Sequence, residues 1–241
     1  MTRLVAIALA ALALPASVAG GTPITVLAAA SLTDVFPRID KAPRYSFAGS
    51  DQLALQIRQG APADVYAAAS PKYTQLLYRD GIVSKPVVFA TNKLIVLIPR
   101  SNPAGIQTVY DLRHEGVKLV IGDRSLPIGT YTRQILDTLG ITAEVMKHVV
   151  SQETDVKGIV SKIALGEADA GFVYRTDAKP VAARTRVISL PGWAQPPVRY
   201  EVAVVRASGH RAAARAFIQR VTSQRGRRLL ARAGFGLPKQ P

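Results

Sequence analysis

Two serines of the 241-residue chain stand where an expected strand runs into an expected helix. Ser31 follows an apolar run at residues 24–30, and Ser50 follows Gly49 at the start of a helical pattern. A serine hydroxyl and the free main-chain N–H groups of a first helical turn both donate hydrogen bonds, so such a turn is suited to binding an anion. For Ser31, a plain capping serine is the alternative and the better explanation of that turn taken alone.

Three further positions offer hydrogen-bond donors of the same kind. Ile128 and Val156 lie at expected helix starts and, having no polar side chain, can contribute only their main-chain N–H groups. Tyr174 ends an expected strand with a phenol, for which a buried structural role is the alternative. Together the five positions describe helix N-termini and neutral hydroxyls around one anion, a site that needs no full counter-charge.

Two charged residues near these turns bear on that hypothesis. Asp51 would place a negative charge beside an anion, which is tolerable only if its carboxylate turns away to cap the helix. It would also supply the acceptor that the proton of monohydrogen phosphate requires. Arg124 is better explained as a surface loop residue than as the counter-charge of the anion.

Alternating strand and helix patterns place these turns in an α/β fold with mostly parallel sheets. In such sheets ligands sit beyond the carboxyl ends of the strands, where the helices begin. Strands are expected at residues 24–30, 64–69, 94–98, 117–122, 170–174, 187–190 and 200–205. Helices are expected at residues 49–60, 71–80, 108–114, 130–139, 155–165 and 210–231.

The composition argues against several classes of protein. Hydrophobic residues make up 48% and charged residues 20%, which is typical of a globular chain. The formal net charge is +15, but the basic residues are spread along the chain and aromatic residues, at 6%, are not interleaved with them. We therefore expect a solvated cationic surface and no nucleic-acid partner. The absence of cysteine excludes disulfides and thiolate metal sites.

No enzyme signature stands out in the sequence. It contains no nucleophile elbow, no phosphate-binding loop of the Walker type and no dinucleotide-binding glycine motif. His114, His148 and His210 lie far apart and lack metal-ligand spacing. The chain is therefore not expected to be an enzyme, and a hydrolase whose active site follows no known motif is the alternative from a different class.

Residues 1–19 have the three parts of a cleavable signal peptide. Arg3 gives a positive start, residues 4–14 form an apolar run, and residues 17–19 form a small-residue cleavage site. The apolar run is too short to span a bilayer, which argues against a membrane anchor. We therefore expect an exported protein that diffuses freely, as a monomer, in the periplasm.

Several segments, in order, resemble a known family. They are AAASLTD at 28–34, IRQGAPADVYAAAS at 57–70, the GD…PIGTY loop at 122–131, ETDVKGIVSKIALGEADAGFVY at 153–174 and AGFGLP at 233–238. In these segments the chain resembles the periplasmic molybdate-binding proteins of ABC importers. The resemblance runs from Ile24 to about Leu237, and AAASL and GAPAD are its most specific marks.

The resemblance implies capture of molybdate or tungstate, without a cofactor, for delivery to an inner-membrane ABC permease. It implies an oxyanion bound by Ser31 and Ser50 through hydroxyl and N–H, by Ile128 and Val156 through N–H alone, and by Tyr174 through its phenol. The same five residues would be the metal-binding set if the molybdenum or tungsten oxyanion is counted as a metal. It also implies two lobes, at residues 20–90 plus 197–241 and at 91–196, with crossover strands at 94–98 and 200–205.

Three departures from the family pattern keep other ligands open. The stretch between the two serines is shorter than usual by about two helical turns, or about 10 Å of helix, and it contains Pro37. Gly49 and Asp51 stand where many relatives have further hydroxyls, and Ile128 is bulkier than the small residue often found there. Another oxyanion, such as sulfate, thiosulfate or phosphate, is therefore the alternative ligand.

Overall fold

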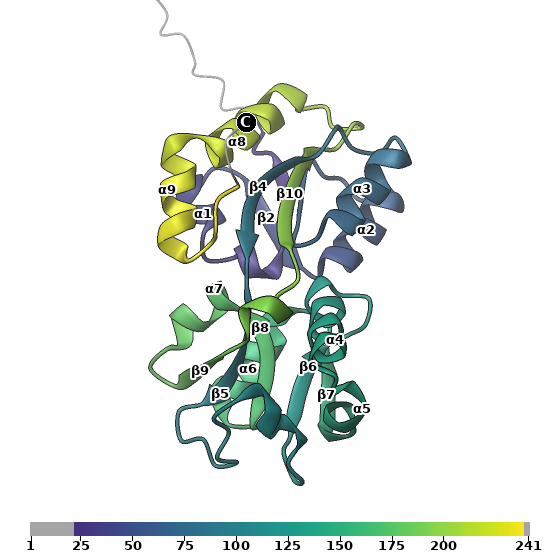
Figure 1. The fold of residues 1–241 in the computed structure, drawn as a ribbon. Coiled ribbons are helices and arrows are strands. Elements are labelled where there is room, and N and C mark those ends of the chain that lie inside the picture. The colour runs from purple at the N-terminus through teal and green to yellow at the C-terminus, as the bar shows by residue number, and fades with distance from the viewer. Residues whose placement is uncertain (1–21, 239–241) are drawn as a thin grey trace, which may run out of the picture.

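The computed structural model describes residues 22–238, so the signal peptide expected at residues 1–19 lies outside the described residues. The described chain forms two lobes, each built on one five-stranded sheet with helices packed against it (Figure 1). Among residues 22–238, no helix combines the length and the apolar composition that crossing a bilayer requires.

The first lobe is built on a sheet whose strands follow the order β2-β1-β3-β10-β4. These strands are β1 (Thr25–Ala29), β2 (Arg44–Ala48), β3 (Val65–Ala68), β4 (Val87–Asn92) and β10 (Val198–Val204). Strand β1 pairs in parallel with β2 and β3, whereas β10 runs antiparallel to β3 and β4. The carboxyl ends of the three parallel strands therefore meet at the same edge of the sheet.

Helices cover both faces of this first sheet (Figure 1). They are η1 (Ala30–Leu32), α1 (Phe36–Ile39), α2 (Ser50–Arg58), α3 (Pro71–Arg79), α8 (Arg211–Thr222) and α9 (Gln224–Ala233). Helices α2 and α3 pack on one face, and α1, α8 and α9 cover the other, where the rings of Phe36 and Phe217 meet edge to face at 5.5 Å. Because side chains alternate along a strand, the neighbours Val26 and Leu27 enter different hydrophobic cores.

The second lobe is built on a sheet with the strand order β7-β6-β8-β5-β9. Its strands are β5 (Leu94–Pro99), β6 (Leu119–Gly122), β7 (Val149–Glu153), β8 (Ala170–Tyr174) and β9 (Thr185–Ser189). Its helices are η2 (Val109–Arg113), α4 (Pro127–Leu139), α5 (Thr142–Val145), η3 (Met146–His148), α6 (Val156–Leu165), α7 (Arg175–Ala178), η4 (Lys179–Val181) and η5 (Gly192–Ala194). Strand β6 is parallel to β7 and β8, and β5 is antiparallel to β8 and β9.

The two-lobed α/β fold expected from the sequence is confirmed, but each sheet is mixed rather than mostly parallel. Each contains two parallel and two antiparallel pairings. The physical reason is the path of the chain between the lobes. The strand that follows each crossing, β5 in the second sheet and β10 in the first, enters its new sheet in the reverse direction.

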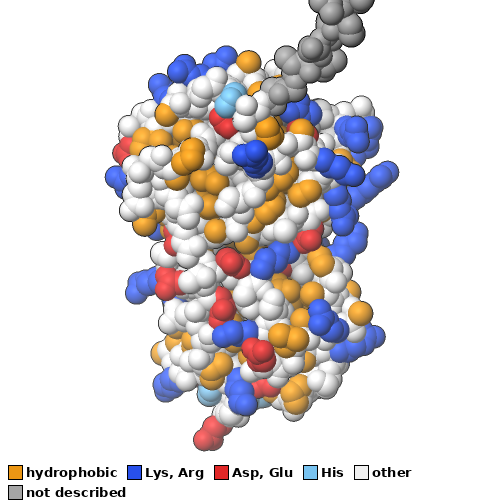
Figure 2. Space-filling view, turned by 180° about the vertical axis from the view of Figure 1, so that it is seen from behind, with side chains coloured by type: hydrophobic (Ala, Val, Ile, Leu, Met, Phe, Trp, Pro, Cys, Tyr) orange, Lys and Arg blue, Asp and Glu red, His pale blue; other side chains and the backbone are white. Residues whose placement is uncertain are grey.

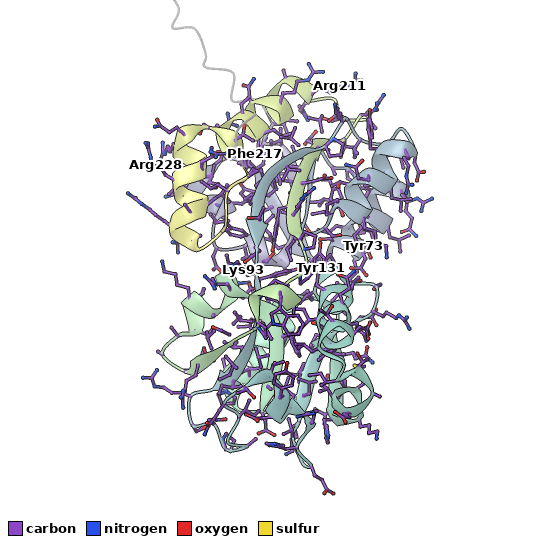
Figure 3. The ribbon with its side chains drawn as sticks, viewed as in Figure 1. Tyr73, Lys93, Tyr131, Arg211, Phe217 and Arg228 are labelled. Atoms are coloured by element: carbon purple, nitrogen blue, oxygen red, sulfur yellow. The ribbon has the colours of Figure 1, made fainter. Side chains whose placement is uncertain are left out.

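The chain crosses between the lobes over very short segments. Strand β4 ends at Asn92 and β5 begins at Leu94, so the outgoing crossing is the single residue Lys93, labelled between the lobes in Figure 3. The returning crossing lies between η5 and β10. The side chain of Gln195 in that segment accepts a hydrogen bond from the N–H of Leu94 at 3.0 Å and donates one to its carbonyl at 2.8 Å. The two crossings are thereby joined to each other.

The strands β2, β4 and β7 were not expected from the sequence. All three lie at the edges of their sheets, where one side of the strand has no neighbour. Strands β2 and β7 are only partly buried. The side chains of β2 are exposed or half-buried, and those of β7 alternate between half-buried and exposed. Such strands lack the continuous apolar run that identifies a central strand.

The single closing helix expected at residues 210–231 is wrong, because the structure has two helices, α8 and α9, separated at Ser223. The backbone of Ser223 is extended, and its hydroxyl accepts a hydrogen bond from the N–H of Gly226 at 3.1 Å, which caps α9. Gly226 packs directly on the end of α8, where an added Cβ would lie 2.2 Å from the carbonyl oxygen of Arg220. A serine cap and a glycine contact therefore turn the chain where periodicity alone indicates one helix.

The packing of Gly226 gives a stability prediction. We expect Gly226→Ala to lower the free energy of unfolding by about 1–3 kcal/mol, because the methyl group forces α8 and α9 apart. Urea unfolding measures the effect. The control is Gly209→Ala, where nothing lies within 4 Å of an added Cβ and the change should stay within about 0.5 kcal/mol. Equal effects of the two substitutions would contradict the tight junction.

Candidate functional site

A small cavity between the two lobes is lined by all five candidate residues from the sequence. Ser31 and Ser50 come from the first lobe, and Ile128, Val156 and Tyr174 from the second. No residue of the five is more than 5% exposed. The cavity volume is about 20 Å³, which is suited to a compact group. The rest of the wall is Ala29, Ala30, Ala48, Gly49, Ala69, Leu126, Pro127 and Asp155.

Three helices begin at the wall of this cavity with a free main-chain N–H group. Ser50 is the first residue of α2, and Val156 is the first residue of α6. Ile128 is the second residue of α4, after Pro127, which has no N–H to give. The first N–H groups of a helix have no partner within it and carry the positive end of the helix dipole. The cavity is therefore suited to a negative group.

The side chain of Asp155 caps helix α6 and determines which of the first N–H groups of the helix stays free. One carboxylate oxygen of Asp155 accepts hydrogen bonds from the N–H of Lys157 at 2.7 Å and of Gly158 at 3.0 Å. The side chain thus satisfies the second and third N–H groups of the helix and leaves that of Val156, the first. The negative charge of Asp155 thereby interacts with the positive N-terminal end of α6.

Gly49, immediately before Ser50, allows the two lobes to touch beside the cavity. An added Cβ at Gly49 would lie 2.5 Å from Leu126 Cδ2 and 2.7 Å from the carbonyl oxygen of Thr154, both in the second lobe. A side chain would hold the lobes apart at this corner, so the close approach of the backbone requires glycine.

The two serine hydroxyls each have a partner in the protein. Ser50 Oγ accepts a hydrogen bond from the main-chain N–H of Ala69 at 3.1 Å, which leaves the serine proton free for donation. Ser31 Oγ lies 2.9 Å from the hydroxyl of Tyr200. Both hydroxyls are therefore fixed in position before any ligand is considered.

The phenol of Tyr174 is a buried polar group without a partner. Its hydroxyl is fully enclosed and makes no hydrogen bond to any described residue. Burial raises the pKa of this phenol well above its ordinary value, so it carries its proton at neutral pH and can donate it. A buried, unpaired hydroxyl costs about 1–3 kcal/mol. The structure therefore carries an energetic cost that a hydrogen-bond acceptor in the cavity would offset.

In the part of the chain that the structure describes, Asp155, whose Oδ1 caps α6, is the one charged side chain in the cavity wall. Among the described residues, no lysine or arginine lines it, and Arg124 lies exposed on the surface. Asp51 does not line it either, because its carboxylate turns across the lobe boundary and accepts a hydrogen bond from Ser125 Oγ at 2.5 Å. Figure 2 shows Lys and Arg side chains spread over the outside of both lobes. Any attraction for an anion inside the cavity must therefore come from N–H and O–H dipoles.

Ion pairs and hydrogen bonds cross the lobe boundary around the cavity. Lys157 Nζ of α6 lies 2.7 Å from a carboxylate oxygen of Asp34 in the first lobe. The same ammonium lies 3.4 Å from Asp177 Oδ1, but no described group donates a well-formed hydrogen bond to that fully buried carboxylate. Burial raises the pKa of Asp177 to about 6. Tyr73 of α3 donates to the carbonyl of Ser125, and Figure 3 shows Tyr73 at this boundary.

Several of these supporting residues gave no signal in the sequence. The partner of Ser31, Tyr200, is 169 positions away, and the pair formed by Asp34 and Lys157 is 123 positions apart. No local motif predicts such contacts, because they exist only after the lobes have packed. Among the described residues, no group of three or more His, Cys, Asp or Glu side chains could hold a metal ion.

Comparison with known proteins identifies the family of the chain. The family model described as bacterial extracellular solute-binding protein matches residues 24–236. The chain is 35% identical to the molybdate-binding protein ModA of Mycobacterium tuberculosis over 229 residues, covering 91% of this chain and 86% of that protein. It is 31% identical to the molybdate-binding protein ModA of Haemophilus influenzae over 238 residues, covering 91% and 92%.

Two solved structures share the fold. The periplasmic molybdate-binding protein of Azotobacter vinelandii superimposes with a TM-score of 0.79 at 22% identity, covering 90% of this chain and all of that one. The sulfate-binding protein SubI of Mycobacterium tuberculosis gives a TM-score of 0.75 at 18% identity, covering 89% and 86%. At these identities the likeness concerns the fold alone.

The buried carboxylate of Asp177 gives a pH prediction. Because its folded-state pKa is raised to about 6 from an ordinary 3.8, folding is favoured by protonation, and this contribution is lost as the pH rises through 6. Relative to Asp177→Asn, the native protein should gain about 2–3 kcal/mol of unfolding free energy between pH 7 and pH 4. Urea unfolding of both proteins without oxyanion measures the difference. A difference that does not change with pH would contradict the raised pKa.

Proposed function

The chain belongs to the family of bacterial extracellular solute-binding proteins, and on that premise we propose that it captures molybdate or tungstate between its lobes for an ABC importer. The observation that carries the proposal is the cavity itself. It brings three free helix N-termini, two serine hydroxyls and the unpaired phenol of Tyr174 around about 20 Å³ of buried space. The ligands in this proposal are Ser31, Ser50, Ile128, Val156 and Tyr174.

Such a donor set favours a compact anion that carries no proton. A fully deprotonated tetrahedral oxyanion accepts hydrogen bonds in every direction, which matches donors arriving from both lobes. The low dielectric of a buried site strengthens each of these bonds. Size then separates the larger molybdate and tungstate ions from sulfate, and it separates molybdate from tungstate far less.

The orientation of Asp51 bears on the alternative ligands. A phosphate binder needs an acceptor for the proton of monohydrogen phosphate, and Asp51 was the candidate. Its Oδ2 instead accepts a hydrogen bond from Ser125, its buried Oδ1 has no partner among the described residues, and Asp51 does not line the cavity. Asp51 therefore gives no support for phosphate over sulfate or thiosulfate.

The place of the protein in transport follows from the family and its relatives. Relatives 31–35% identical over about 90% of the chain are molybdate-binding proteins. We propose export to the periplasm through the signal peptide at residues 1–19, lobes at 20–90 plus 197–241 and at 91–196, and action as a monomer. The loaded protein would deliver its anion to an inner-membrane permease, with no cofactor and no catalytic step.

Calorimetric titration of the dialysed mature protein tests the proposal. Molybdate and tungstate should each bind tightly with one site per chain, and sulfate and phosphate should bind far more weakly at the same salt concentration. Heat from sulfate or phosphate, with none from molybdate and tungstate, would replace the proposed ligand by another oxyanion. No heat from any of the four would contradict the proposal as a whole.

Tyr174→Phe separates a ligand role from a structural role of the phenol. Loss of one donor to a charged ligand should weaken molybdate binding roughly tenfold to a hundredfold. The ligand-free protein should be as stable as before or more stable, because the substitution removes an unpaired buried hydroxyl. Titration and thermal unfolding measure the two effects, with the half-exposed Tyr78→Phe as the control. A destabilised variant with unchanged affinity would indicate a core tyrosine.

A further inference from the structure

The side chain of Asn92 has a fixed orientation at the crossing between the lobes. Its Oδ1 accepts a hydrogen bond from the main-chain N–H of Lys93 at 2.9 Å. Its Nδ2 donates to Thr176 Oγ1 in the second lobe at 3.0 Å and, more weakly, to the hydroxyl of Tyr200 at 3.4 Å. A flipped amide would set its NH₂ group against the N–H of Lys93, so Asn92 can present only donors to Tyr200.

The proton of Tyr200 is thereby directed to Ser31. The tyrosine hydroxyl has two described neighbours within hydrogen-bond distance, the amide nitrogen of Asn92 and Ser31 Oγ at 2.9 Å. The amide nitrogen has no lone pair to accept with, so Tyr200 donates to Ser31. Because Ser31 Oγ already accepts this bond, the serine's own proton points elsewhere, and the cavity is the space that Ser31 lines.

The ring of Tyr200 is held so that this direction cannot change easily. Tyr200 is fully buried on β10. Its ring meets Tyr174 at 5.8 Å, Phe89 at 6.1 Å and Phe235 at 5.3 Å, each nearly edge to face. Aromatic contacts from three sides leave the phenol one position, with its hydroxyl beside Ser31.

We propose that Tyr200 is a positioning residue: held by Asn92, it donates to Ser31 and so directs the hydroxyl proton of Ser31 into the cavity, where that proton is donated to the bound oxyanion. This inference rests on the proposed function and adds to it the residue that sets the hydrogen-bond direction of one ligand. A hydroxyl has only one proton to donate, so fixing the direction of that proton prepares Ser31 as a donor before the anion arrives.

Two other groups near the cavity are compatible with this direction. The phenol of Tyr174 carries its proton at neutral pH, because burial raises its pKa. Asp155 lines the cavity, but its carboxylate accepts two main-chain N–H groups of α6. The contact between Tyr200 and Ser31 is therefore the one that sets the direction of the Ser31 proton.

A double-mutant cycle tests whether Tyr200 acts through Ser31. Molybdate affinity is measured by calorimetry for the native protein, Ser31→Ala, Tyr200→Phe and the double variant. We expect Tyr200→Phe to weaken binding about five- to tenfold in the native background and less than twofold in the Ser31→Ala background. An equal loss in both backgrounds, or no loss in the native one, would overturn the proposal, because the ring would then act through shape or not at all.

The titrations of the native protein and of Tyr200→Phe test the proposed function and the role of Tyr200 separately. If the native protein binds no molybdate, the proposed function fails at the first titration and the cycle has no starting value. If the native protein binds molybdate tightly and Tyr200→Phe binds it equally well, only the role of Tyr200 is overturned. Thermal unfolding of each variant confirms that the comparison is between folded proteins.

Discussion

The rest of the structure depends on one constraint. Hydrogen-bond donors must surround a buried group, and no full positive charge may be buried with it. A lysine in this cavity would have to be desolvated and would hold its anion strongly even when release is needed. Main-chain N–H groups at helix starts avoid both problems, because they are partly positive, rigid and already part of the fold. This requirement explains why Ser50, Ile128 and Val156 all stand within the first two positions of a helix.

The two lobes and their connections follow from the same constraint. Parallel strands bring helix starts to one edge of a sheet, and two such edges facing each other surround a small volume with donors. The single crossing residue Lys93 and the side chain of Gln195 keep the connection between the lobes short. Across the boundary, Asp34 pairs with Lys157, and Gly49 leaves space for direct contact. Asn92 lies at the same crossing, so the crossing and the cavity wall are joined by hydrogen bonds through Tyr200 and Ser31.

Much of this arrangement could be predicted from the sequence, for identifiable reasons. Central strands such as β5 are continuous apolar runs, and helix starts have characteristic residues, so the α/β class and the five cavity residues followed from patterns and from a family resemblance. The edge strands and the break at Ser223 did not, because they depend on neighbours or on one cap. Contacts such as Tyr200 with Ser31 are beyond sequence reasoning, since they join residues 169 positions apart only after the chain has folded.

Binding of molybdate in the cavity is tested most directly by a crystal structure of the protein with molybdate, using anomalous diffraction at the molybdenum absorption edge. We expect one strong anomalous peak per chain in the cavity between the lobes. The oxygens around it should lie within hydrogen-bond distance of the hydroxyls of Ser31, Ser50 and Tyr174 and of the N–H groups of Ile128 and Val156. A peak elsewhere on the molecule, or an anion held by lysine or arginine side chains, would contradict it.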